Sequence, residues 1–455
     1  MPTPATIAVI DIGKTNAKVV LIDTASATQV DVLSMPNTPV VDGPYPHADV
    51  EGLWAFILAS LKMLHARHGI SAISITTHGA TAALVAGDGL ALPVLDYEYA
   101  GPEETGLEYG KVRADFAESY SPRLPNGLNL GAQIFWQSRK FPAEFGRAEA
   151  ILTYPQYWAW RLTGIKASEV TSLGCHTDLW APDKGDFSSL VAAQGWGRLF
   201  PAVKPAASAL GPILPEIAAG AGLKADTPVA CGIHDSNASL LPHLGRHETP
   251  FTVISTGTWT ICMTVGGATT GLDRERDSLA NVDAFGRPVP TARFMGGREF
   301  DTLAAGAGAP SEAELDRVIR DRVQVLPTFI AGVGPFPRGQ GRWTTAPEGL
   351  TPGERYAAAS LYLALVAEAA LSLCGTGKRI VIEGPLARNA LFGAALARVT
   401  GVPVTASADA TGTSLGASLL LAPLDGRGHE PGALMPLVHD GFAAYRDAWR
   451  ARAGT

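Results

Sequence analysis

The sequence predicts an α/β protein built from two related halves. Short β-rich runs alternate with helix-periodic segments, and no short fixed repeat is present. The strand-like run IAVIDIG at 7–13 passes through the turn KTNA into a second run, KVVLID. FTVIS at 251–255 passes through TGT into WTICMTV in the same way. Because this strand–turn–strand pattern occurs twice, we expect residues 7–22 and 251–265 to open two halves of one plan.

The composition and net charge of the chain argue against some classes of function. The chain has 455 residues, of which 46% are apolar and 17% charged, enough apolar material for two full-sized cores. The net charge of −7 gives no general attraction to nucleic acid or to an anionic membrane. We therefore expect neither a nucleic acid nor a membrane as a partner, and a homodimer is compatible with the sequence.

The cysteines and the N-terminus predict a cytoplasmic enzyme. The four cysteines form no C-x-x-C pair, which argues against a zinc site or a disulfide framework. The start MPTPATIAVIDIG has no basic n-region and is not expected to be a signal peptide.

In the first half, apolar spacing and Gly or Pro punctuation predict the elements in order. These are strands at 7–12 and 18–23, a helix at 53–68 ended by Gly69, a buried strand at 72–77, a polar irregular stretch at 100–150, a helix at 151–164, a loop-rich stretch at 181–227, and a strand, glycine turn and helix start in TPVACGIHDSNASLL.

In the second half, the hairpin at 251–265 precedes a long Ala-rich helix at 354–375, which Glu368 interrupts and which is expected to be buried rather than membrane-spanning. The strand RIVIEG, a helix through Leu396, the strand VPVTA and a small-residue helix in TGTSLGASLLLA follow. We expect domains at 1–245 and 246–440, with a C-terminal tail at 441–455.

The turn after the first strand is the first candidate site. Gly13-Lys14-Thr15 superficially ends a P-loop, but Ala8 stands where the first glycine is needed, and the turn leads into a strand rather than a helix. A hairpin turn still offers amides and hydroxyls to a phosphate, and Asp11 at the strand end could hold Mg²⁺ directly or through water. The alternative is an ordinary turn capped by Asp and Asn.

The segment 232–238, GIHDSNA, is the candidate for chemistry. Asp235 lies at a strand-to-helix junction beside His234, where a carboxylate can accept the proton of a substrate hydroxyl. Helix capping would explain Asp235 or Ser236, but it gives no reason for His234. His78-Gly79 ends the strand at 72–77, a usual place for substrate contacts, although a buried structural histidine explains it equally well.

The second half offers two weaker candidates. Ser255-Thr256-Gly257-Thr258-Trp259 suits a second phosphate-contacting hairpin, though such turns are common. Glu383-Gly384-Pro385, followed by Arg388-Asn389, ends a strand in glycine and could admit an adenine or ribose, or could be a plain β-α-β crossover.

Taken in order, these motifs resemble the FGGY carbohydrate kinases of the actin–hexokinase–Hsp70 superfamily. DIGKTNAK resembles the family's first phosphate loop, GIHDSNA its catalytic segment, STGTW its second phosphate loop, EGPLARN with GVPV its adenosine region, and ATGTSLGAS its closing helix. WAWRLTG and its sequel also resemble a family segment. The resemblance spans residues 7–422 and implies two ribonuclease-H-like α/β domains flanking a cleft.

The resemblance also implies site residues, with ATP and Mg²⁺ as the cofactors. Asp235 would be the general base and Asp11 would face the metal. The implied substrate-binding residues are His78, Gly79, His234, Ser236 and Arg298. The implied nucleotide-binding residues are Gly13, Lys14, Thr15, Asn16, Thr256, Gly257, Thr258, Gly384 and Asn389.

Within the family, the His-Asp pair and STGTW are most similar to rhamnulokinases and L-fuculokinase-type enzymes. The implied activity is phosphorylation of a primary hydroxyl of a ketose or deoxyketose. Two departures alter the site: Glu383-Gly384-Pro385 replaces a run of glycines, and 293–299 reads RFMGGRE where rhamnulokinases have an Asn after Arg-Phe. A pentulose or polyol kinase and a non-catalytic sugar or nucleotide sensor are the alternatives. A hydrolase is disfavoured because no G-x-S-x-G elbow is present, and a dehydrogenase because no G-x-G-x-x-G fingerprint was found.

Overall fold

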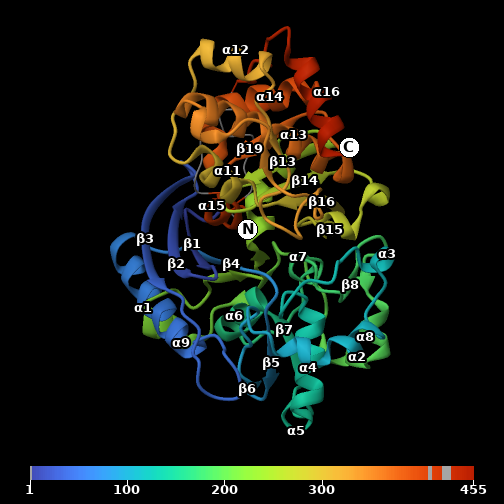
Figure 1. The fold of residues 1–455 in the computed structure, drawn as a ribbon. Coiled ribbons are helices and arrows are strands. Elements are labelled where there is room, and N and C mark those ends of the chain that lie inside the picture. Colours follow the sequence, from blue (N-terminus) through green and yellow to red (C-terminus); the bar gives the residue numbers. More distant parts are fainter. Residues whose placement is uncertain (1–2, 408–411, 423–431, 455) are drawn as a thin grey trace. The chain divides into compact units, whose positions relative to one another are not determined.

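The computed structural model describes residues 3–407, 412–422 and 432–454, which form two compact units. Among these residues, unit 1 contains 3–246, 281–287 and 412–422, and unit 2 contains 247–280, 288–407 and 432–454. Figure 1 shows a sheet with flanking helices in each unit.

The main sheet of unit 1 is built around the predicted hairpin. Its strands are β1 (Thr6–Ile12), β2 (Asn16–Asp23), β3 (Thr28–Pro36), β4 (Ala72–Thr77), β10 (Ala209–Pro212), β11 (Pro228–Ala230) and β12 (Ile233–His234). They run in the order β10-β11-β4-β1-β2-β3, and β12 pairs with β4. β1 is antiparallel to β2, with Thr6 opposite Asp23 and Ile12 opposite Ala17, and parallel to β4.

Helices cover this sheet and set the position of its functional edge. They are α1 (Val50–His68), α6 (Tyr154–Thr163), α9 (Pro215–Ala221), α10 (Asp235–Leu244) and α15 (Gly412–Ser418). As expected, α1 ends at Gly69, where φ is 78°, and Asp49 caps its start by accepting from Gly52 N at 2.9 Å. α15 packs against α10 so closely that a Cβ on Gly416 would lie 1.7 Å from Ala238 O.

A second layer of unit 1 has two small sheets, one of three strands and one of two, and its own aromatic core. Its strands are β5 (Ala82–Ala86), β6 (Gly89–Leu92), β7 (Ala150–Thr153), β8 (Trp180–Ala181) and β9 (Asp186–Phe187). Its helices are α2 (Gly106–Gly110), α3 (Phe116–Ser119), α4 (Leu130–Lys140), α5 (Pro142–Phe145), α7 (Val170–Leu173) and α8 (Ser189–Ala193), with 3₁₀ helices η1 (Gly101–Thr105) and η2 (Trp196–Leu199).

Two expectations for this layer were wrong. Residues 100–150 are not irregular throughout, because α4 spans 11 of them. Most of α4 is buried, so the polar face that gives a surface helix its periodicity is missing. The helix expected at 151–164 starts three residues later, because 151–153 complete β7 and pair with β5, and Pro155 then opens α6.

Unit 2 repeats the strand plan of unit 1. Its main sheet runs in the order β15-β16-β14-β13-β19-β20. These strands are β13 (Phe251–Thr256), β14 (Thr260–Val265), β15 (Ser278–Val282), β16 (Pro288–Phe294), β19 (Ile380–Glu383) and β20 (Val404–Ala406), and β17 (Val325–Leu326) pairs with β18 (Arg342–Trp343).

The correspondence between the two sheets is strand for strand. β13 is antiparallel to β14 and parallel to β19, as β1 is to β2 and β4. The five-strand orders β3-β2-β1-β4-β11 and β16-β14-β13-β19-β20 therefore match, each with its second strand reversed. This is the predicted ribonuclease-H-like plan, present in both units.

The core of unit 2 is centred on the predicted Ala-rich helix. Its helices are α11 (Gly296–Ala304), α12 (Glu312–Arg320), α13 (Pro352–Cys374), α14 (Ala390–Thr400) and α16 (Phe442–Ala453), with 3₁₀ helices η3 (Thr269–Gly271), η4 (Arg274–Arg276), η5 (Pro347–Gly349) and η6 (Pro385–Arg388). α13 is long and apolar enough to cross a membrane by length and composition, but it is buried inside the unit. This confirms its interpretation as a core helix.

The two units of the structure differ from the predicted domains in three places, which are the C-terminal segment and two short segments. Residues 441–455 were expected to be a tail, but α16 packs into unit 2 through Phe442, Tyr445 and Trp449, each about 1% exposed. Apolar residues at i, i+3 and i+7 supply this buried face. The segments at 281–287 and 412–422 group with unit 1, although they follow residue 245.

Candidate active site

In unit 1, strand ends and one helix start gather most of the predicted site residues. Asp11 ends β1, His78 and Gly79 follow β4, and His234 ends β12, directly before Asp235 opens α10. β1 and β12 both pair with β4 in parallel, so their carboxyl ends lie at the same edge of the sheet. The structure therefore brings these residues together from positions more than 220 apart in sequence.

The Asp235 carboxylate is held by hydrogen bonds and is still accessible to solvent. Its Oδ1 accepts from Ser236 N at 2.6 Å and Ser236 Oγ at 3.3 Å, and lies 3.1 Å from His234 Nε2. Its side chain is 35% exposed, so a substrate can reach it. Ser236 thus orients Asp235 directly, and its own hydroxyl is turned towards that carboxylate.

His234 is buried between Asp235 and Cys175. Its Nε2 lies 3.7 Å from Cys175 Sγ, and its backbone N–H donates to Thr171 Oγ1 at 3.0 Å. Burial lowers the pKa of His234, but the negative charge of Cys175 and Asp235 outweighs burial and raises it to about 9. The His234 imidazole is therefore charged at neutral pH. Burial raises the pKa of the Cys175 thiol, but the imidazoles of His176 and His234 outweigh burial and lower that pKa.

Gly79 and His78 form the opposite side of this cluster. A Cβ on Gly79 would lie 2.7 Å from His234 Nε2, so only glycine leaves room for the ring. His78 packs against the Tyr97 and Tyr154 rings, and its Nδ1–H donates to Gly79 O at 3.0 Å. Burial lowers the pKa of His78, which keeps this second imidazole neutral near pH 7.

Asp11 lies near Asp235 and is buried. Its Oδ2 accepts from Ser414 Oγ at 2.8 Å. Burial raises the pKa of Asp11 and the Asp235 charge adds to this, while Ser414 and Lys18 act in the opposite direction. Two neighbouring carboxylates of like charge favour a cation between or beside them.

The donors at Asp11 fit Mg²⁺ held together with a phosphate. Among the described residues, no group of three or more His, Cys, Asp or Glu could hold a metal ion. Mg²⁺ commonly uses one or two carboxylates and completes its shell with phosphate oxygens and water. Asp11 is therefore the residue that would hold the ion.

The turn at 13–16 is a tight two-residue hairpin. Gly13 N donates to Asn16 O at 2.9 Å, and Asn37 ties the turn by donating to Gly13 O and Thr15 O. Thr15 and Asn16 are exposed, as a phosphate-contacting turn requires. Lys14 pairs with Asp96, lies 3.4 Å from Glu98 and sits 5.0 Å above the Tyr97 ring. Its ammonium group is therefore held by the loop after Leu95.

The remaining predicted residues belong to unit 2, around the turn between β13 and β14. Gly257 N donates to Trp259 O at 2.8 Å, and the Thr256 hydroxyl donates to Glu383 O while accepting from Leu386 N. Gly384 has a φ of 80°, and a Cβ there would lie 1.9 Å from Thr256 O. This joins Thr256 to Gly384, so the second hairpin and the EGP segment form one surface with Thr258 exposed.

Arg298 and Asn389 have positions that the sequence did not reveal. Arg298 N donates to Thr258 O at 3.3 Å and its side chain is exposed, so it stands beside the second hairpin and not with the other predicted sugar residues in unit 1. Asn389 is buried, caps α14 by accepting from Phe392 N at 2.9 Å, and donates to Ser360 Oγ. Its side chain thus has an internal role.

Sequence reasoning missed five residues in unit 1: Asp96, Glu169, Thr171, Cys175 and Ser414. Four of them reach the site through a contact with a residue more than 55 positions away in sequence, and Glu169 reaches it through its hydrogen bond from Thr171. The hydroxyl-rich stretch TGTS at 411–414, where the closing helix was expected to begin, was the one signal that could have pointed to Ser414.

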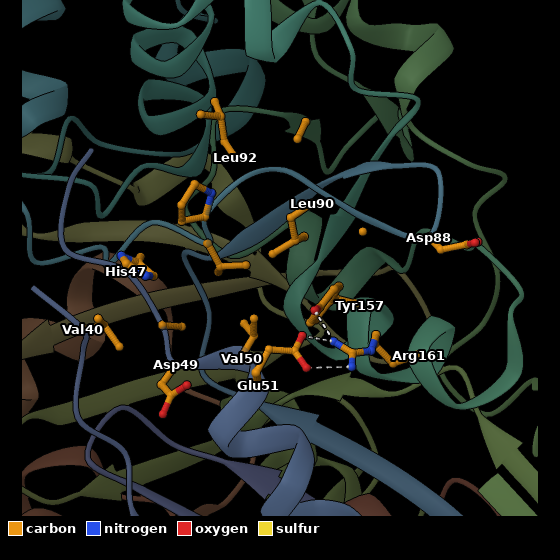
Figure 2. Close-up of a pocket in the computed structure, with 15 residues that line it drawn as sticks. Val40, His47, Asp49, Val50, Glu51, Asp88, Leu90, Leu92, Tyr157 and Arg161 are labelled. Carbon is orange, nitrogen blue, oxygen red and sulfur yellow. Dashed lines mark hydrogen bonds and ion pairs between the residues drawn. The ribbon is translucent and has the colours of Figure 1, made fainter. Parts of the chain in front are cut away.

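A cavity of about 500 Å³ in unit 1 lies elsewhere. Figure 2 shows it lined by the loop before α1, by β6 and by α6, and none of the predicted site residues lines it. Arg161 is engaged there by Glu51 at 2.8 and 3.3 Å and by the Tyr157 hydroxyl at 2.9 Å. The candidate active site is thus defined by converging strand ends rather than by cavity size.

Comparison with known proteins identifies the family. The model of the FGGY N-terminal domain matches residues 124–242, and that of the carbohydrate kinase FGGY C-terminal domain matches 248–430. A solved carbohydrate kinase from Novosphingobium aromaticivorans is 38% identical, covers 100% of this chain and 99% of its own, and superimposes with a TM-score of 0.91. The chain belongs to the FGGY family of carbohydrate kinases.

Two characterised FGGY kinases are more distant. L-Fuculokinase from Salmonella typhi is 28% identical over 209 residues, which cover 44% of this chain and 42% of that enzyme. L-Xylulose/3-keto-L-gulonate kinase from Escherichia coli is 28% identical over 167 residues, covering 35% of this chain and 31% of that enzyme. The matched parts thus span less than half of either relative. The family is established, and it does not specify the sugar.

Proposed function

We propose that this FGGY protein is an ATP-dependent kinase that phosphorylates a primary hydroxyl of a ketose or deoxyketose similar to L-rhamnulose or L-fuculose. The observation that supports this most directly is the placement of Asp235. It is oriented by Ser236 and His234, partly exposed, and near Asp11 at the same edge of the sheet. One carboxylate is thereby available to a hydroxyl and the other to a metal.

In the proposed reaction, an oxygen of the Asp235 carboxylate takes the proton of the sugar hydroxyl. The hydroxyl oxygen then forms a bond to the γ-phosphorus of ATP, and the bond from that phosphorus to the β-γ bridging oxygen breaks to release ADP. Mg²⁺, when bound at Asp11, would offset charge on the phosphates. The charged His234 holds Asp235 in place and, with His78 and Gly79, forms the sugar side of the site.

Each unit, taken by itself, has a hairpin that we assign to phosphate oxygens of the nucleotide. In unit 1 the exposed residues are Thr15 and Asn16, and in unit 2 they are Gly257 and Thr258, which Thr256 and Gly384 support from below. We assign Arg298 to this nucleotide set rather than to the sugar set, because it adjoins Thr258. We assign Asn389 to the structure of α14. We further propose that the enzyme is cytoplasmic.

A pentulose kinase is the second candidate. The similarity to an L-xylulose/3-keto-L-gulonate kinase favours it as much as the similarity to L-fuculokinase favours a deoxyketose. A coupled assay for ADP release over L-rhamnulose, L-fuculose, L-xylulose, D-xylulose, D-ribulose and glycerol separates these candidates. We expect one ketose to exceed the others by at least about tenfold in kcat/KM. ADP release that ignores the sugar would reject a sugar kinase, and no release at all would favour a sensor.

Replacement of Arg298 tests its assignment to the nucleotide. We expect Arg298→Ala to raise the KM for ATP about tenfold or more, because a charged hydrogen bond to phosphate contributes about 1.5–3 kcal/mol. The KM for the sugar should change less than about twofold. Arg398→Ala, which removes an exposed arginine from α14 in the same unit, is the matched control. A rise in the KM for the sugar alone would show that Arg298 binds the sugar and not the nucleotide.

A further inference from the structure

Unit 1 buries a carboxylate that the proposed reaction does not use. Glu169 is 0% exposed and precedes α7. Its oxygens accept from Thr171 N at 3.0 Å, Thr171 Oγ1 at 2.5 Å and Ser172 N at 3.4 Å. Burial raises the pKa of Glu169 to about 7, although these hydrogen bonds and the nearby His234 charge lower it. A buried carboxylate is costly to maintain unless its bonds do something specific.

The bonds of Glu169 lead to His234 through a single hydroxyl. Thr171 Oγ1 gives its proton to Glu169 Oε2 and accepts the backbone N–H of His234 at 3.0 Å. A hydroxyl has one proton, so donation to Glu169 turns its lone pairs towards His234. Glu169 thereby fixes the direction in which Thr171 accepts, and Thr171 fixes the backbone one residue before Asp235.

The same segment holds His234 from its ring side as well. Cys175 Sγ lies 3.7 Å from Nε2, and the next turns of the chain are strained, with φ of 42° at His176 and 66° at Asp178. Asn129 donates to His176 O, and Arg113 donates to Asp178 at 2.7 Å, which locks these conformations. Strain that is held in place by surrounding bonds is a feature of functional segments. The segment from Glu169 to Asp178 therefore contacts His234 at both backbone and ring.

We propose that Glu169 and Thr171 are positioning residues for phosphoryl transfer, which hold the His234–Asp235 junction so that Asp235 meets the sugar hydroxyl. This role rests on the proposed function. Neither residue contacts the reacting atoms; both act through the backbone of His234. Because misplacement of a catalytic group by about 1 Å can cost 10²-fold in rate, their loss acts on kcat with the sugar rather than on affinity for ATP.

Three substitutions in the short helix α7 test this role. Thr171→Val keeps the shape but removes the hydroxyl, Thr171→Ser keeps the hydroxyl, and Ser172→Ala removes a neighbouring buried hydroxyl for which the described residues provide no hydrogen-bond partner. We expect Thr171→Val to lower kcat with the preferred ketose about 10- to 100-fold, with the KM for ATP within about twofold. Thr171→Ser should recover most of the rate, and Ser172→Ala should match the wild type.

The deciding readout is the ratio of sugar-dependent to sugar-independent ADP release. Loss of folded protein lowers both rates together and leaves the ratio unchanged, whereas a misplaced base lowers only the first. Glu169→Gln, which keeps the shape but removes the charge, should lower the same ratio. This variant replaces Thr171→Val in the test if Thr171→Val does not fold. An unchanged ratio in both variants would reject the positioning role. A wild type that phosphorylates no sugar would instead reject the proposed function, and this role with it.

Discussion

Asp235→Asn is expected to abolish sugar phosphorylation while leaving ATP affinity nearly intact. General-base catalysis contributes about 10²–10⁴-fold, and an amide cannot take the hydroxyl proton, so kcat should fall at least 10²-fold. The hydrogen bonds from Ser236 can persist to the amide oxygen, so the fold of α10 should be retained. The measurement is the rate of sugar-dependent ADP formation beside the affinity for ATP, with thermal unfolding as a check of folding.

The matched control is Asp226→Asn, which makes the same change at an exposed position in unit 1 and should behave as wild type. Asp235→Asn also removes a charge that raises the pKa of His234, so the imidazole should lose its proton at a lower pH in this variant. Full sugar phosphorylation by Asp235→Asn would show that another group accepts the proton.

Gly79→Ala should damage sugar use with little effect on ATP. The added Cβ would lie 2.7 Å from His234 Nε2 and 3.6 Å from Cys175 Sγ, and no positive φ is involved, so the effect is one of space alone. The ring cannot move freely, because Cys175 and Asp235 contact its Nε2 and Thr171 holds the backbone N–H of His234. We expect kcat/KM for the sugar to fall at least about tenfold and the free energy of unfolding to fall by about 1–3 kcal/mol, the usual cost of overpacking.

Gly220→Ala is the control for this change. Gly220 lies in α9 with open space where the Cβ would be, so the substitution should leave activity unchanged and stability equal or slightly higher. Kinetics with varied sugar and varied ATP distinguish the outcomes. An equal loss of affinity for both substrates would place the effect on the fold of unit 1 rather than on the sugar side of the site.

Local sequence patterns were sufficient for the parts of this protein that depend on neighbours in the chain. The hairpins at 7–23 and 251–265 follow from two apolar strands joined by turn-forming residues, and their register needs no other part of the chain. The junction at His234–Asp235 likewise follows from a strand, a glycine turn and a helix start. For the same reason, the repeated plan of the two units can be recognised from the sequence.

The tertiary structure decided which side chains share a site. Ser414 reaches Asp11 from 403 positions away, and Thr171 reaches His234 from 63. Arg298 stands beside Thr258, whereas Asn389 is used in capping α14. A one-dimensional pattern records spacing along the chain, and these contacts arise from the crossing of strands and helices that are distant in sequence. The sequence by itself therefore determined the family, the paired α/β plan and the order of the motifs, while the folded chain alone determined the partners of each candidate residue.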